Sequence, residues 1–316
     1  MNNQNLIFCI NKQKIKSKLT QQIKFFSVHE ISDLDGPCEI EVSCTKFNCY
    51  FKRSNVKKLY VFLSAVGKSS VKYPQFHRVA WTDIYDGCCL CIDDPTREEI
   101  NFAPSFYFGK CTDNYLDKIQ IIVQNISNCF DIPSHNIFFI GSSNGGFASL
   151  YLANQFTNTN AIVLNPQFNI PLYFITEKTI GDMELFQKKI GIDFKDVNFK
   201  KRLNVESILY NMKSNFIIAV NLQARCDLEQ ISYIFKKINF EIKEGVYKFN
   251  NCTFVLYRIN TKNPHLAQPD ENFTRFLEFF THKFDQDLID IANLFSNLTK
   301  KIYQLQDVLN QTKIKE

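Results

Sequence analysis

The sequence has few of the features that mark a metal, membrane or nucleic-acid protein. It contains only five histidines in 316 residues, and none is spaced with the cysteines as a zinc site requires. No apolar run reaches the roughly 18 residues that a membrane-spanning helix needs. The net charge of +5 comes without a strong basic block, so it permits an anionic ligand without requiring one. We therefore expect no metal, no transmembrane segment and no nucleic-acid partner.

Signs of export are also missing. Apolar residues 6–10 precede four lysines between positions 12 and 18, which reverses the charge order of a signal peptide. The eleven cysteines are odd in number, and Cys88, Cys89 and Cys91 lie in an apolar stretch where cysteine acts as a small core residue. We expect free thiols in a reducing cytoplasm.

What the sequence does contain is a strand–turn–helix signal at residues 136–156. Residues 136–140 are mostly apolar and predict a buried strand, and residues 147–156 predict a helix. The turn Gly141-Ser142-Ser143-Asn144-Gly145 fits the pattern G-x-S-x-G of a nucleophile elbow. Glycines are needed on both sides because other side chains would collide with neighbouring backbone in so sharp a turn. Ser142 does not fit, because no glycine stands two residues before it; the alternative is a plain glycine-rich turn.

Strands and helices alternate along the rest of the chain. Residues 38–51 predict an edge strand and residues 114–130 an amphipathic helix, and further strands are predicted at 57–63, 88–92, 161–164, 215–222 and 252–259. This alternation indicates an α/β fold, a mostly parallel sheet with helices on both faces. Ligands of such sheets bind beyond the carboxyl ends of the strands.

Three residues of complementary chemistry follow predicted strands. Ser143, Asp227 and His265 should emerge on one edge of the sheet, in the order serine, acid, histidine that is typical of α/β-hydrolases. A serine hydroxyl needs a base within hydrogen-bond reach, and the base needs an acid that fixes its tautomer. We assign these roles to His265 and Asp227.

Alternatives exist for both partners of the serine. His77 competes with His265 as the base, and Glu229 or Asp270 could replace Asp227 as the acid. Without a catalytic role, Asp227 would cap the helix predicted at 228–237, and His265 would cap a turn.

The small-residue loop at 64–70 follows the strand at 57–63. In a hydrolase-type sheet this loop supplies one N–H group of the oxyanion hole, here from Ala65 or Val66. Asn144, directly after the nucleophile, supplies the other. The alternative is a simple surface turn.

Two further segments depart from the alternation. Residues 168–213 are aromatic and lysine-rich and stand between two core strands, so we expect a cap over the site, with Tyr173, Phe174 and Phe186 able to cover it. Residues 284–316 repeat apolar residues at spacings of four and three, which indicates a coiled-coil seam and a homo-oligomer. The alternative is a helix packed on its own domain. The hydrolase domain is thus predicted at 1–283.

Across residues 57–285 the sequence resembles a group of bacterial α/β-hydrolase-fold proteins from polysaccharide loci, similar to capsule polysaccharide O-acetyltransferases. The segments that carry this resemblance are Ser64-Ala65-Val66-Gly67, Phe76-His77-Arg78 with Trp81, Asp94-Pro95-Thr96, Tyr107-Phe108-Gly109, residues 141–146 and Asn165-Pro166-Gln167. The resemblance implies that Ser143 carries the acetyl group, with Asp227 and His265. Ala65 stands where glycine is expected and His77 where an aromatic residue is usual. Arg78 either binds an anionic group or is a buried structural arginine.

Three functions fit these observations. The first is a cytoplasmic O-acetyltransferase that moves acetyl from acetyl-CoA, its co-substrate, to a polysaccharide or sugar hydroxyl. The second is a carbohydrate or carboxyl esterase that uses the same three residues with water as acceptor. The third is a non-catalytic scaffold of polysaccharide assembly, which would have no need for Ser143, Asp227 and His265 together.

Overall fold

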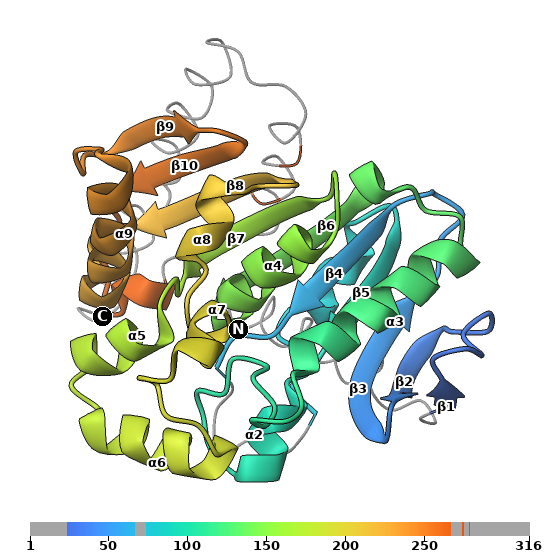
Figure 1. Cartoon of the computed structure of the whole chain (residues 1–316). Coiled ribbons are helices and arrows are strands. Elements are labelled where there is room, and N and C mark those ends of the chain that lie inside the picture. Colours follow the sequence, from blue (N-terminus) through green and yellow to red (C-terminus); the bar gives the residue numbers. More distant parts are fainter. Residues whose placement is uncertain (1–23, 67–73, 267–273, 275–277, 279–316) are drawn as a thin grey trace, which may run out of the picture.

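A ten-stranded, mostly parallel sheet forms the centre of the molecule (Figure 1). The computed structural model describes residues 24–66, 74–266, 274 and 278. The strands lie in the order β1-β2-β3-β5-β4-β6-β7-β8-β10-β9. Their bounds are β1 Lys24–Ser27, β2 Gly36–Val42, β3 Thr45–Lys52, β4 Leu59–Leu63, β5 Cys88–Ile92, β6 Ile137–Ser143, β7 Asn160–Pro166, β8 Asn215–Asn221, β9 Gly245–Phe249 and β10 Cys252–Tyr257.

The central strands are apolar on both faces. All residues of β4, β5, β6, β7 and β10 are buried, as expected for parallel strands that are covered on each side. The pairings β4–β5, β4–β6, β6–β7, β7–β8 and β8–β10 are all parallel. The carboxyl ends of β6, β8 and β10 therefore lie along one edge, as the sequence predicts.

The antiparallel pairs lie toward the sides of the sheet. Residues 38–51, predicted as a single edge strand, instead form the hairpin β2–β3, and β1 adds a further strand outside it. Ser43 and Cys44 turn this hairpin with positive φ angles of 47° and 63°. Both residues sit in the left-handed region that glycine and asparagine usually occupy, so the sequence gives no turn signal there.

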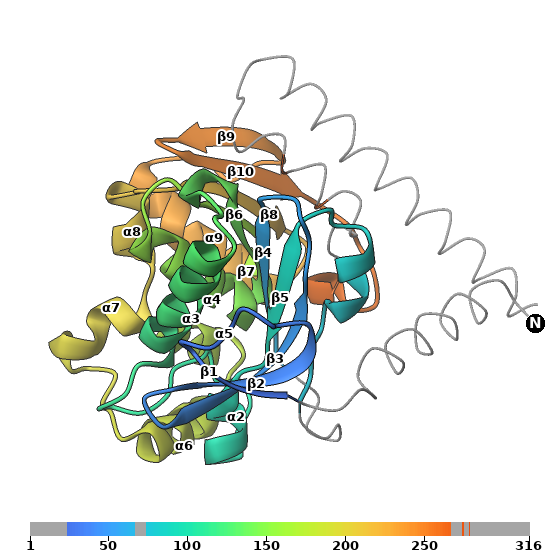
Figure 2. The ribbon, with the colours of Figure 1, turned by 90° about the vertical axis from the view of Figure 1, so that its right-hand side faces the viewer.

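The long helices of the described part share one face of the sheet. They are α3 (Tyr115–Cys129), α4 (Asn144–Gln155) and α9 (Arg225–Ile238), with the short α2 (Pro95–Ile100), and Figure 2 shows them on the same side. On the opposite face the described residues include η1 (Val79–Asp83) and Tyr85 just after it; Tyr85 contacts Tyr60 and Phe62, and Val79 belongs to the same buried cluster. The amphipathic helix expected at 114–130 is confirmed as α3.

Between β7 and β8 the chain forms a small helical group. It comprises α5 (Ile170–Thr176), α6 (Ile180–Ile190), η3 (Val197–Phe199), α7 (Lys200–Leu203) and α8 (Glu206–Tyr210). Phe174 and Phe186 are fully buried and contact Phe106, so these helices are held on the loop after α2. Phe174 and Phe186 therefore form the inner core of this segment. Of the three aromatic residues expected to cover the site, only Tyr173 lines the pocket described below.

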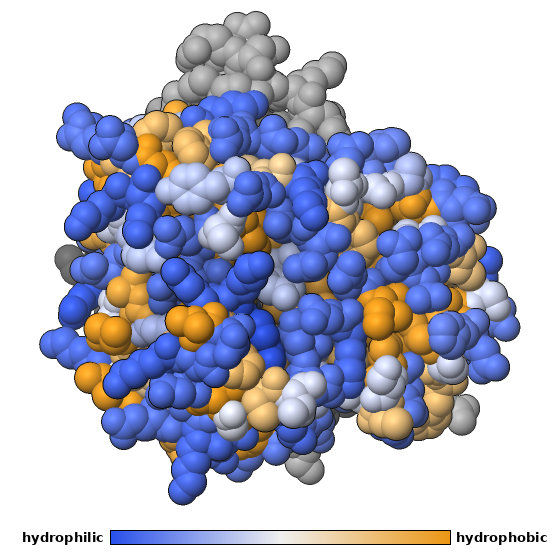
Figure 3. Space-filling view, viewed as in Figure 1, coloured by the Kyte–Doolittle hydropathy of each residue, from blue (hydrophilic) through white to orange (hydrophobic). Residues whose placement is uncertain are grey.

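The face that carries α3, α4 and α6 is mostly hydrophilic, with apolar side chains scattered over it (Figure 3). In the described part of the chain, no helix is long and apolar enough to cross a membrane. The predicted seam at 284–316 and Asp270 lie outside the described residues.

Candidate active site

Ser143 stands in a strained turn at the end of β6. Its φ of 52° and ψ of −120° belong to a region that a non-glycine residue rarely adopts, and α4 begins at the next residue. A Cβ on Gly141 would lie 2.1 Å from the carbonyl oxygen of Gly145, and one on Gly146 would lie 2.7 Å from Cβ of Pro166. These close approaches are the physical reason for glycine at position 141 of the motif and at position 146 just after it.

Gly145 brings the helix against the loop that follows β4. A Cβ there would lie 2.3 Å from the carbonyl oxygen of Leu63 and 2.8 Å from that of Ser64. Only glycine permits this contact. As a result the N-terminus of α4, where backbone N–H groups have no partner within the helix, lies directly beside residues 63–66.

His265 pairs with Asp227 at the neighbouring strand ends. Nδ1 of His265 lies 2.8 Å from Oδ1 and 2.9 Å from Oδ2 of Asp227. The side chain of Asp227 is fully buried, whereas that of His265 is 30% exposed. Because Nδ1–H donates to the carboxylate, Nε2 is the basic nitrogen of the ring.

The pair has shifted proton affinities. Burial raises the pKa of Asp227 to about 6, and the hydrogen bond from His265 opposes this rise. Burial acts to lower the pKa of His265, but the hydrogen bond to Asp227 and its charge, with a contribution from Glu177, hold that pKa above its ordinary value. His265 therefore accepts a proton more readily than an isolated imidazole does.

Two buried asparagines fix the backbone that carries His265. Nδ2 of Asn165, at the end of β7, donates to the carbonyl oxygen of His265 at 2.9 Å. Nδ2 of Asn221, at the end of β8, donates to the carbonyl oxygens of Ile259 and Pro264, both at 2.9 Å. The loop after β10 is thus tied to the two strands beside it.

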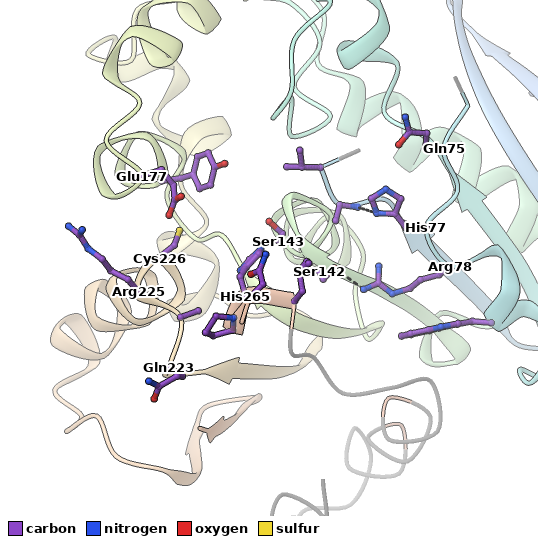
Figure 4. A pocket seen from close by; sticks show the side chains of 18 residues that line it. Gln75, His77, Arg78, Ser142, Ser143, Glu177, Gln223, Arg225, Cys226 and His265 are labelled. Atoms are coloured by element: carbon purple, nitrogen blue, oxygen red, sulfur yellow. Dashed lines mark hydrogen bonds between the residues drawn. The ribbon is translucent and has the colours of Figure 1, made fainter. Parts of the chain in front are cut away.

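Ser143 and His265 line the same pocket, which has a volume of about 910 Å³ (Figure 4). The structure brings most of the residues predicted for the site to this pocket: Ala65, Val66, His77, Arg78, Ser143 and His265. Asp227 lies behind His265. The volume is at the upper end of the usual range for small-molecule sites, so there is room for more than one substrate group.

The loop after β4 is braced by side chains. The N–H of Ser64 donates to Oη of Tyr107 at 2.5 Å, and Tyr107 in turn donates to the carbonyl oxygen of Ile92 at 2.8 Å. The N–H of Ala65 donates to Nδ1 of His77 at 3.2 Å. The N–H of Ala65, one of the expected oxyanion donors, therefore already has an acceptor. Val66 and Asn144 remain the candidate oxyanion donors.

His77 differs from His265 in chemistry. Desolvation by neighbouring atoms, with Arg78 and Arg97, lowers its pKa to about 4 although the residue keeps an exposed surface, so it is neutral at physiological pH. With Nδ1 accepting from Ala65, its proton is on Nε2, and the ring presents a donor rather than a base.

Arg78 is a buried cation next to the elbow. It is 7% exposed, its Nη2 donates to Oγ of Ser142 at 2.8 Å, and its guanidinium stacks on Trp81 with 4.9 Å from Cζ to the ring centre. Desolvation lowers the pKa of Arg78 to about 10, which leaves the group charged at neutral pH.

Sequence reasoning placed some residues imprecisely and missed others. Asp227 was expected in a loop but lies in the first turn of α9, where a carboxylate is favoured by the helix dipole. Glu229 lies exposed on the same helix. Glu177, which lines the pocket and acts on both partners of the pair, has no signal in the sequence, and Tyr107 is visible only as part of an aromatic loop.

Solved structures share this arrangement of elements. The capsule O-acetyltransferase of Neisseria meningitidis serogroup A superposes with a TM-score of 0.57 at 18% identity, over 79% of this chain and 96% of that one. The acylaminoacyl peptidase of Pyrococcus horikoshii superposes with a TM-score of 0.55 at 14% identity, over 80% of this chain and 43% of the peptidase. The chain has the α/β-hydrolase fold.

In this chain Ser143 ends β6, and Asp227 and His265 follow the later strands β8 and β10, which is the chain order serine, acid, histidine that α/β-hydrolases have. A further structure of the Neisseria enzyme, a histidine-to-alanine mutant in complex with CoA, superposes with a TM-score of 0.56 at 18% identity, over 77% of this chain and 94% of that one. No protein-family model and no curated protein sequence matches the chain. At these identities the likeness shows the α/β-hydrolase fold and not the reaction.

Proposed function

We propose that the chain is a serine-dependent O-acetyltransferase, which moves acetyl from acetyl-CoA to a hydroxyl of a polysaccharide through an acetyl-Ser143 intermediate. The observation that carries the proposal is the Asp227–His265 pair in the wall of the pocket that Ser143 also lines. A cytoplasmic location is part of the proposal, because acetyl-CoA is a cytoplasmic donor.

In the first half of the reaction, Oγ of Ser143 attacks the thioester carbonyl and Nε2 of His265 takes the hydroxyl proton. The tetrahedral intermediate then expels the thiolate of CoA, which takes this proton from the imidazolium. In the second half a sugar hydroxyl attacks the acetyl-serine, His265 takes the hydroxyl proton and returns it to Oγ. Asp227 holds the tautomer of His265 and stabilises its cationic form throughout.

The negative charge on the carbonyl oxygen needs donors that are already in place. Asn144 begins α4, so its N–H belongs to the helix N-terminus beside Ser143. Val66 lines the pocket on the other side, in the loop that Gly145 contacts. We assign the N–H groups of Asn144 and Val66 as the oxyanion donors.

The segment 168–213 is the cap of this site in our account. Tyr173 and Glu177, from α5 and the residue after it, line the pocket opposite Ser143. Exclusion of water by such a cap favours a sugar hydroxyl over water as acceptor. With water as the acceptor, the same three residues would make an esterase.

The solved structures of this fold support acyl transfer. They include a capsule O-acetyltransferase, a mutant of this enzyme in complex with CoA, and an acylaminoacyl peptidase. Both kinds of enzyme handle acyl groups, and the complex with CoA supports a CoA thioester as donor.

Trapping the intermediate tests the proposal. The pure protein is mixed with acetyl-CoA, quenched in acid and digested, and the mass of the peptide that contains residues 141–147 is measured by mass spectrometry. We expect one added acetyl group, located at Ser143, in the wild type. The variant Ser143→Ala should carry no acetyl group at this peptide, and His265→Ala should form it far more slowly. An acetyl group that forms equally in Ser143→Ala would refute the role of this serine.

A further inference from the structure

Arg78 and Arg97 are two equally buried arginines with different partners. Each is 7% exposed. Arg97 has the carboxylate of Asp93 at 3.4 Å. Among the residues that the structure describes, no carboxylate lies within ion-pair distance of Arg78, and its Nε is buried without an acceptor. The two arginines thus share the same burial but differ in charge compensation.

The surroundings of Arg78 do not neutralise it. The side chains that act on its charge are those of Tyr85, Tyr107 and Cys91, two phenols and a thiol, which are neutral at pH 7 at their ordinary pKa values. Within the described ranges, its side-chain hydrogen bond is to the neutral hydroxyl of Ser142, and its guanidinium stacks on the ring of Trp81. A cation taken out of water costs free energy that neutral partners do not fully offset.

The location of this charge points to a ligand. Arg78 lines the same pocket as Ser143, and its guanidinium points toward Ser142, the neighbour of the nucleophile (Figure 4). His77, next to it in sequence, is neutral with its Nε2–H as donor. A planar guanidinium with an unused N–H matches the oxygens of a phosphate or a carboxylate.

We propose that Arg78 forms an anion subsite, which binds a phosphate or carboxylate group of a substrate beside the acyl-transfer centre. The subsite rests on the proposed function only in treating the pocket as a substrate site, because binding is measurable without turnover. The anion belongs either to the donor, since acetyl-CoA is a thioester whose nucleotide part carries phosphate groups, or to an acidic sugar acceptor.

Thermal unfolding tests the subsite without any catalysis. The protein Ser143→Ala is melted in sodium chloride and in sodium phosphate of equal ionic strength. We expect phosphate to raise the melting temperature of this parent. The added change Arg78→Gln should reduce the phosphate effect to the general stabilisation that an excluded anion gives any folded protein. It should not lower the melting temperature in chloride, because it removes an uncompensated charge. Arg53→Gln is the matched control, since Arg53 is an exposed arginine that also stacks on an aromatic ring, Phe130, outside the pocket. It should keep the phosphate effect.

Other melting-temperature results would overturn the subsite. If phosphate does not stabilise the parent, or stabilises Arg78→Gln as strongly as the parent, no subsite exists at Arg78. If Arg78→Gln only lowers the melting temperature in chloride, Arg78 is a structural arginine. Should Arg78→Gln fail to fold, Arg78→Lys decides instead: it keeps the charge but loses the planar fork, and its affinity for phosphate should fall on the order of tenfold. Unchanged affinity would overturn the proposal.

Kinetics then distinguish the two sources of the anion. Acetyl-CoA is compared with the uncharged donor S-acetylpantetheine, and glucuronate with glucose as acceptor. In Arg78→Gln the KM should rise on the order of tenfold for the charged member of one pair and stay constant for its uncharged partner. A rise for acetyl-CoA assigns the anion to the donor, and a rise for glucuronate assigns it to the acceptor. An equal loss for charged and uncharged substrates would contradict the subsite. If the protein shows no turnover, the proposed function fails and the melting experiment still decides the subsite.

Discussion

Nδ1 of His265 lies within 2.9 Å of both carboxylate oxygens of Asp227, although 38 residues separate them in the chain. The contact exists because β8 and β10 are parallel neighbours, so the segments that follow them meet at one edge. The carboxylate is buried and the imidazole is partly exposed to the pocket. The proposed general base thus has its carboxylate partner shielded from solvent, while the imidazole lines the pocket.

The pH dependence of activity should reflect this contact. His265 acts as a base only when neutral, and its pKa is above the ordinary value. The acid limb of kcat/KM for p-nitrophenyl acetate should therefore lie above about pH 6.5, and activity should fall as the pH drops through it. Because Glu177 also raises this pKa, Glu177→Gln should move the limb to lower pH. Glu229→Gln, on an exposed residue of α9, is the control and should leave it unchanged. An acid limb that stays at the same pH in Glu177→Gln would contradict the assignment of this limb to His265.

Ser143 and Ser142 should respond very differently to removal of their hydroxyls. Ser143→Ala should lower kcat by on the order of 10⁶, the usual loss for a nucleophile of this kind, while the circular dichroism spectrum stays that of the wild type. Ser142→Ala removes only the acceptor of the Arg78 hydrogen bond and should retain substantial activity toward neutral esters. An inactive Ser142→Ala together with an active Ser143→Ala would show that Ser143 is not the nucleophile.

Gly145 should tolerate no side chain. In Gly145→Ala the new Cβ would meet the backbone oxygens of Leu63 and Ser64, so the free energy of unfolding should fall by about 1–3 kcal/mol and activity should drop as the loop is displaced. Gly181→Ala is the matched control: nothing lies within 4 Å of its Cβ, and it sits in helix α6, so it should stabilise by up to about 1 kcal/mol. Urea unfolding of both variants measures the difference, and equal stability would speak against the close approach.

Tyr107 should act on the site through the backbone of Ser64. In Tyr107→Phe the buried N–H of Ser64 and the carbonyl oxygen of Ile92 both lose their partner, which should cost about 1–3 kcal/mol and lower kcat more than it raises KM. Tyr210→Phe removes a hydroxyl that bonds the carbonyl oxygen of Lys237 on the surface, and both quantities should stay near wild type. An unchanged kcat in Tyr107→Phe would show that this loop does not take part in the reaction.

Much of the fold follows from local pattern. The central strands are continuous apolar runs, and α3 has its apolar residues on one face, so both are visible in the sequence. The pattern G-x-S-x-G is also readable in a short window, and the collision that demands Gly141 is with Gly145 inside it, although Gly145 itself is required by Leu63 and Ser64, which are distant in sequence. Asp227 and His265 could be predicted because each follows a strand of the parallel sheet.

Other features depend on contacts that no short window contains. The hairpin turn at Ser43 and Cys44 has positive φ angles without glycine, so residues 38–51 looked like one strand. Helix α2 was not predicted, although Asp94 caps it and Pro95 opens it, because it spans only six residues. Phe174 and Phe186 looked like cap residues facing the site, but their partner Phe106 is far away in sequence.

The most direct test of the account is the release of CoA from acetyl-CoA with and without a polysaccharide that has free hydroxyls. If the acetyl-serine is shielded from water and passed to a sugar, the wild type should release CoA slowly alone and much faster with the acceptor, with ping-pong kinetics, and Ser143→Ala should release none in either case. Rapid release of acetate that no sugar accelerates would make the protein an esterase. CoA release equal to that of Ser143→Ala under both conditions would contradict acyl transfer from acetyl-CoA altogether.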